Sequence, residues 1–175
     1  QPSKITIFGF LFTLSQLCFN SLSSVALLNL GISGAQGTGK TTLSYILSQL
    51  LTKQQFKIAQ FSLDDFYLTK NERKLLASQE HPLLCTRGVP GTHDTGMLLT
   101  KLHGLLNQKE NQNIKIPKFN KADDERAPEG NWSTVKGSVD AILVDGWFVG
   151  ATPLDPKMLE DPINELEKTE DITRE

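Results

Sequence analysis

Residues 34–41, GAQGTGKT, have the composition and spacing of a phosphate-binding loop. They match the pattern G-x-x-x-x-G-K-[ST], in which glycines allow a tight turn whose backbone N–H groups point at phosphate oxygens. A helix that begins at the loop adds the positive end of its dipole. We expect Lys40 to reach the β and γ phosphates of ATP and the Thr41 hydroxyl to bind Mg²⁺. The predicted nucleotide-binding residues are Gly34, Ala35, Gln36, Gly37, Thr38, Gly39, Lys40, Thr41 and Thr42.

Carboxylates follow two other apolar runs. In SLDDFYL, Asp64 and Asp65 come directly after a predicted strand, and ligands of open α/β sheets bind beyond the carboxyl ends of the strands. Asp64 is therefore placed to accept a proton from an attacking hydroxyl. The alternative, that the acid caps the following segment, is favoured for Asp65. In ILVDGW, Asp145 ends an apolar strand and is predicted to hold Mg²⁺ rather than merely to cap a turn with Gly146.

Residues 120–123, NKAD, spell the N-K-x-D string with which GTPases read guanine. In those proteins the string follows the strand that carries the metal-binding carboxylate, whereas here it precedes Asp145. The order of the motifs therefore argues against a GTPase.

The elements that position these residues alternate between β-like and helix-periodic segments, which is typical of βα units around a parallel sheet. We predict an α/β fold, a P-loop NTPase-type three-layer sandwich with a mostly parallel central sheet. Strands are expected at residues 27–33, 57–63, 113–119 and 141–147, the third interrupted by proline near a sheet edge. Helices are expected at residues 41–53, 71–79 and 95–107, and residues 81–94 form an irregular loop. The predicted apolar stripe of the first helix is Leu43, Ile46, Leu47, Leu50 and Leu51.

The composition is that of one ordinary globular domain. The chain has 175 residues, 38% of them hydrophobic, and its net charge of −2 provides no basic excess for binding nucleic acid. Two cysteines without metal or disulfide spacing indicate a reduced, cytoplasmic compartment. Residues 1–26 form an apolar leader, which is either a buried amphipathic helix, a non-native leader, or a targeting or membrane segment. The first two are favoured over the third because polar residues interrupt the run.

From about residue 31 to 153 the chain resembles the D-glycerate 3-kinase family and its ATP-dependent relatives in the phosphoribulokinase and uridine kinase superfamily. The resemblance implies transfer of the γ-phosphoryl group of ATP to a hydroxyl of a small molecule, with D-glycerate as the leading candidate. It also implies that the reaction requires Mg²⁺. Asp64 is then the catalytic base and Lys40 a second catalytic residue, in a kinase core at residues 27–175 that is incomplete at its carboxyl end. The strings that carry the resemblance are GISGAQGTGKTTL, FSLDDFYLT, RGVPGTHD, IPKFNKADDERAP and ILVDGWFVG.

A glycerate carboxylate requires a basic partner, for which arginine has the best geometry. Two alternatives to a glycerate kinase stay open: a kinase for a nucleoside, pantothenate or sugar phosphate, and a nucleotide-binding module without turnover. The second arises because superfamily members continue through a basic lid that this sequence does not contain. The sequence leaves the oligomeric state open. Candidate carboxylate-binding residues, each with the alternative of a solvated surface charge, are Arg87, His93, Lys118, Lys121 and Arg126.

Overall fold

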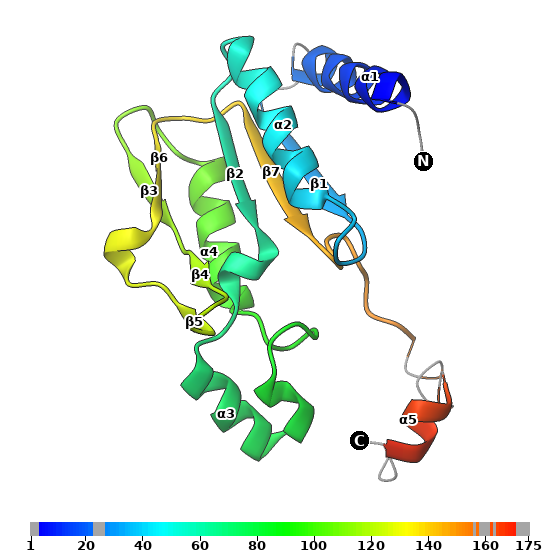
Figure 1. Cartoon of the computed structure of the whole chain (residues 1–175). Helices are drawn as coiled ribbons and strands as arrows, with labels where there is room; N and C mark the ends of the chain where they lie inside the picture. The colour runs from blue at the N-terminus through cyan, green and yellow to red at the C-terminus, as the bar shows by residue number, and fades with distance from the viewer. Residues whose placement is uncertain (1–3, 23–26, 156, 158–161, 163, 171–175) are drawn as a thin grey trace.

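A computed structural model describes residues 4–22, 27–155, 157, 162 and 164–170 (Figure 1). The proposed boundary between a leader and a core at residue 26 falls outside the described residues. Along the chain, the first helix is α1 (Lys4–Leu22), and a last short helix, α5 (Glu165–Glu170), follows an extended segment. None of the described helices is long and apolar enough to cross a lipid bilayer.

The centre of the molecule is a parallel sheet of three strands in the order β1-β7-β2. These strands are β1 (Leu28–Ser33), β7 (Ala141–Gly146) and β2 (Ile58–Ser62). β7 is hydrogen-bonded to a neighbour on each side and is buried along nearly its whole length, which explains why its sequence is almost wholly apolar. The mostly parallel sheet predicted from the sequence is confirmed, and it sets the carboxyl ends of all three strands at one edge.

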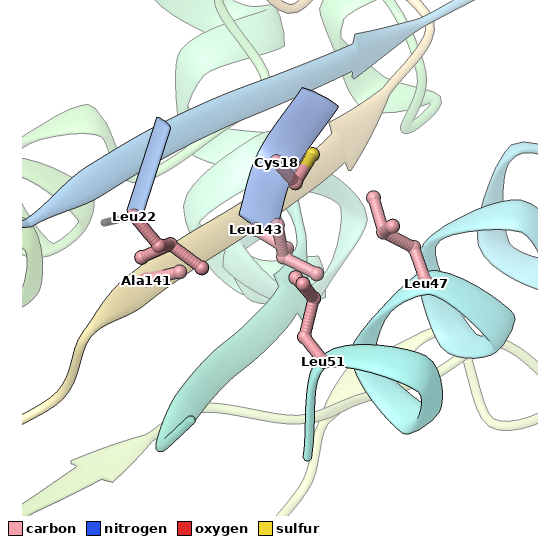
Figure 2. Packing of buried hydrophobic residues seen from close by; sticks show 6 residues of the cluster. All are labelled: Cys18, Leu22, Leu47, Leu51, Ala141 and Leu143. Atoms are coloured by element: carbon pink, nitrogen blue, oxygen red, sulfur yellow. The ribbon is translucent and has the colours of Figure 1, made fainter. Parts of the chain in front are cut away.

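Helices cover both faces of the sheet, as the predicted three-layer arrangement requires. On one face, α2 (Lys40–Lys53) and α1 pack against alternate residues of β7, and Figure 2 shows this cluster of side chains. On the other face, Ile142 of β7 packs with Leu105 of α4 (Thr95–Leu106). The alternation follows from the two-residue period of a strand. The first cluster consists of Cys18, Leu22, Leu47, Leu51, Ala141 and Leu143.

The buried face of α2 differs from the predicted stripe. Leu47 and Leu51 are fully buried as expected. The other buried residues of the helix are Ser44 and Ser48, not the remaining apolar residues of the predicted stripe. Small serine side chains let the helix lie close to the sheet, and the Ser48 hydroxyl donates a hydrogen bond to Gln60 Oε1 of β2 at 2.9 Å. Leu43, Ile46 and Leu50 are half-buried.

The predicted strand at residues 113–119 does not join the parallel sheet. Its first part, β3 (Asn113–Ile116), pairs antiparallel with β6 (Ser133–Lys136), a strand that was not predicted. After Pro117, β4 (Phe119–Asn120) pairs with β5 (Glu125–Arg126) in a second ribbon. Proline has no N–H for a strand ladder, so it separates the two pairings.

Short helices complete the chain. A 3₁₀ turn, η1 (Leu63–Phe66), leads from β2 toward α3 (Lys70–Gln79), and η3 (Glu129–Asn131) precedes β6. The segment 81–94, predicted to be irregular throughout, contains the 3₁₀ turn η2 (Pro82–Cys85), which the His81 side chain caps. Proline at the first position favours such a turn because its fixed φ suits the helical region.

Candidate functional site

The glycine-rich segment links β1 to α2 as a tight loop. Gly37 and Gly39 have φ values of 79° and 86°, in the left-handed region that other residues rarely adopt. The Thr38 hydroxyl and the Lys40 ammonium both donate to the carbonyl oxygen of Ala35, at 2.7 and 2.8 Å. These bonds hold the Lys40 side chain across the loop.

Thr41 and Asp145 meet at the carboxyl edge of the sheet. The Thr41 hydroxyl donates to Asp145 Oδ1 at 3.0 Å, and the Ser62 hydroxyl lies 3.2 Å from the same oxygen. The parallel register places Asp145 beside both Ile32 and Ser62, so the end of β7 lies between the phosphate loop and the end of β2. Asp145 is only 2% exposed, so the Thr41 hydroxyl rather than bulk water holds its carboxylate in position.

Asp64 lies in the 3₁₀ turn that follows β2. Its Oδ1 accepts a hydrogen bond from the Tyr67 hydroxyl at 3.1 Å, and its Oδ2 accepts one from Lys121 Nζ at 2.6 Å. Burial, followed by the negative charge of Asp64, raises the pKa of Tyr67. Tyr67 therefore stays a neutral donor that orients the carboxylate.

Asp65 stabilises the turn after β2 and does not line the cavity described below. It is 6% exposed, accepts hydrogen bonds from the backbone N–H groups of Ser62 and Phe119, and pairs with Lys118 at 3.0 Å. The Ser62 bond belongs to a capping box around the 3₁₀ turn, as the alternative favoured for this residue predicted. Because Lys118 is held by Asp65, it is not directed toward Asp64.

One cavity of about 920 Å³ joins these groups. Asp64, Lys40, Thr41 and Asp145 all line it, so the tertiary structure brings together the predicted catalytic, nucleotide-binding and metal-binding residues. The other described lining residues are Ala35, Gln36, Gly37, Ser62, Tyr67, Lys70, Lys74, Cys85, Thr86, Arg87, Gly88, Lys121, Asp124, Gly146 and Trp147.

The five basic residues predicted as candidates for binding a substrate carboxylate fall into two groups, those that line the cavity and those that do not. Arg87 and Lys121 line the cavity, whereas His93, Lys118 and Arg126 are absent from the lining residues that the structure describes. Arg126 is 12% exposed and donates to the Tyr67 carbonyl and to Asp94.

His93 differs most from the expectation of a cationic ligand. Its ring is 6% exposed, and burial lowers its pKa from 6.5 to about 4 while the charge of Asp64 acts in the opposite direction. The ring is therefore neutral at pH 7 and packs against Tyr67 and Phe148. This burial argues against a role for His93 as a cation for the substrate, because an unpaired imidazolium is unstable in an apolar contact.

Several cavity residues were not anticipated from the motifs. Asp124, in the left-handed region at φ 54°, accepts hydrogen bonds from the fully buried Arg73 and from Arg87. Trp147 donates from Nε1 to the carbonyl of Gly88 at 2.7 Å and so joins the end of β7 to the 81–94 segment. Lys70 and Lys74 were detectable only as a lysine pair at the i, i+4 spacing of a helix.

The oxygen donors at the sheet edge suit a hard divalent cation. A hydroxyl and a carboxylate that lie 3.0 Å apart can occupy neighbouring positions around Mg²⁺, which prefers a few protein oxygens together with phosphate oxygens. The arrangement of loop, cation ligands and a nearby carboxylate can bind a nucleoside triphosphate and deprotonate a hydroxyl.

The chain is similar to several known kinases, although no family model matches it. The chain is 37% identical over 137 residues to the uncharacterized kinase mug58 of Schizosaccharomyces pombe, covering 74% of this chain and 49% of that protein. It is 36% identical over 143 residues to the chloroplastic D-glycerate 3-kinase of Arabidopsis thaliana, covering 78% of this chain and 31% of that protein. The structure of D-glycerate 3-kinase from Cryptococcus neoformans superposes with a TM-score of 0.73 at 27% identity, over 94% of this chain and 59% of that chain.

The sheet, the phosphate loop and these matches define a P-loop kinase fold. Within that class, the chain is a homologue of D-glycerate 3-kinase and of kinases without a named acceptor, which confirms the resemblance stated from the sequence. The chain spans half the length of these curated relatives or less.

Proposed function

We propose that this chain carries the core of an ATP-dependent kinase that transfers the γ-phosphoryl group to a hydroxyl of a small molecule, with D-glycerate as the leading acceptor. The observation that carries the proposal is that Asp64 shares one cavity with Lys40 and the Thr41–Asp145 pair. A phosphate loop alone needs no carboxylate in the turn that follows β2. The homologous kinases support the same reaction class.

The chain's own groups have distinct tasks in this reaction. Asp64 accepts the proton of the acceptor hydroxyl, and its position is held by Tyr67 and Lys121. The acceptor oxygen bonds to the γ phosphorus as the bond to the β–γ bridging oxygen breaks, and ADP leaves. Phosphoryl transfer requires mainly positioning and charge neutralisation, which the phosphate loop and Lys40 supply.

Mg²⁺ is part of the proposal. Thr41 and Asp145 would hold it, and the ion would neutralise charge on the β and γ phosphates when bound. A cytoplasmic location and a small-molecule acceptor without nucleic-acid partners stay predictions from the sequence.

A coupled assay of ADP formation tests the proposal against D-glycerate, other hydroxy acids, nucleosides, pantothenate and sugar phosphates. We expect Asp64→Asn to lower turnover by about 100-fold or more while ATP affinity is unchanged. Asp123→Asn is the matched control, because Asp123 is exposed and is not among the described lining residues.

Each outcome has a distinct meaning. Unchanged turnover in Asp64→Asn refutes the base assignment. Turnover confined to another class of acceptor refutes D-glycerate, and ATP binding without turnover on any acceptor favours a nucleotide-binding module.

A further inference from the structure

Two lysines of α3 line the cavity without a partner for their ammonium groups among the described residues. Lys70 and Lys74 are four residues apart and therefore lie on the same face of the helix. Both line the cavity that contains Asp64. α3 lies beyond the carboxyl end of β2, the strand that the Asp64 turn follows (Figure 1).

The rotation of α3 is fixed by the residue between the two lysines. Arg73 is fully buried and donates to the carbonyl of Leu68 at 2.7 Å, to the carbonyl of Cys85 at 3.3 Å and to Asp124 Oδ2 at 2.6 Å. A capping box of Thr69 and Glu72 fixes the first turn. Because residues 70, 73 and 74 share a face, this anchoring holds the two lysines at the rim of the cavity.

The other cations of the cavity already have partners. Lys121 pairs with Asp64, Arg87 pairs with Asp124, and Lys40 donates to the phosphate-loop carbonyl of Ala35. The backbone N–H of Lys70 donates to Glu125 at 3.2 Å, but this contact leaves its ammonium free. The α3 side of the cavity therefore carries two ammonium groups that form no ion pair with a described acid.

We propose that Lys70 and Lys74 bind the anionic group of the phosphoryl acceptor and so select small hydroxy acids over neutral alcohols. This inference rests on the proposed kinase function. A carboxylate gains charge-assisted hydrogen bonds from two ammonium groups, and the hydroxyl of a short acceptor then reaches Asp64 in the same cavity. Lys70 and Lys74 are thus specificity-determining residues, distinct from the base and from the nucleotide site.

The test is calorimetric titration of the 175-residue chain with D-glycerate and with glycerol, in the presence of Mg²⁺ and a non-hydrolysable ATP analogue. Glycerol replaces the carboxylate with a neutral CH₂OH group. We expect Lys70→Gln and Lys74→Gln each to weaken D-glycerate binding by about 5- to 10-fold, and the double variant by about 30-fold or more. Affinity for the ATP analogue is expected to change less than about twofold. Lys53→Gln, at an exposed lysine near the end of α2 outside the cavity lining, is the matched control.

The outcomes separate this inference from the proposed function. It is overturned if the double variant binds D-glycerate as well as the original chain, or if ATP affinity falls by the same factor. Tight binding of glycerol, or no binding of D-glycerate, also overturns it, and a kinase for neutral acceptors would then remain. If D-glycerate binds through the lysines but is not phosphorylated, the inference stands and the proposed function fails.

Discussion

Acid should destabilise this protein through His93 as the pH falls from 6.5 toward 4. The imidazole is buried, its ring lies 4.3 Å from the ring of Tyr67 and 5.1 Å from that of Phe148, and neither ring nitrogen has a hydrogen-bond partner among the described residues. Burial lowers the pKa of His93 to about 4, against an ordinary value of 6.5. The folded protein therefore resists protonation that the unfolded chain accepts.

The sign and size of the effect follow from linkage. Between pH 6.5 and 4 the unfolded state binds one more proton at this residue than the folded state, so the free energy of unfolding falls as the pH is lowered. The difference between a pKa of 6.5 and one of about 4 corresponds to a loss of about 3 kcal/mol. Above pH 6.5 the ring is neutral in both states, and the contribution is constant.

Urea unfolding at pH 7.5 and pH 4, with His93→Phe as the comparison, measures this loss. Phenylalanine keeps an aromatic ring between Tyr67 and Phe148 but cannot titrate, and the remaining acids contribute alike to both proteins. When the pH is lowered, we expect the free energy of unfolding to fall by about 3 kcal/mol more in the original chain than in the variant. A difference between the two proteins that is the same at both pH values would refute the buried, neutral assignment of His93.

Three further predictions concern the site and its supports. Asp145→Asn is expected to weaken Mg²⁺-dependent ATP binding by about tenfold or more in calorimetric titrations and to leave Mg²⁺-free binding unchanged, and equal losses with and without Mg²⁺ would contradict the metal assignment. Arg73→Met should lower the free energy of urea unfolding by about 2–4 kcal/mol, because it removes the fully buried guanidinium that donates to the carbonyls of Leu68 and Cys85 and to Asp124. A loss below about 1 kcal/mol would show these bonds to be dispensable. Gly39→Ala should lower the same free energy by about 1–2 kcal/mol through its φ of 86° alone, since a Cβ there meets no atom within 4 Å, and unchanged stability would exclude the left-handed conformation.

The sequence predicted the site best where one short segment carries both a motif and its flanking elements. The phosphate loop and the helix after it need only local glycines and helical periodicity, and the structure places them where the pattern indicated. Asp145 was predictable for a similar reason, because a strand buried on both faces is apolar except near its carboxyl end, where ligands of parallel sheets bind. The sheet order then brings Asp145 to Thr41, 104 positions away in the sequence.

The tertiary structure alone decided which basic residues face the cavity. Arg87, His93 and Arg126 look alike in the sequence as basic residues in loops, yet burial makes His93 neutral and Asp94 holds Arg126. The two α3 lysines carry no motif, and they line the cavity because buried Arg73 fixes the rotation of their helix. Side-chain ionisation and direction depend on neighbours that are distant along the chain, and local sequence patterns do not encode those neighbours.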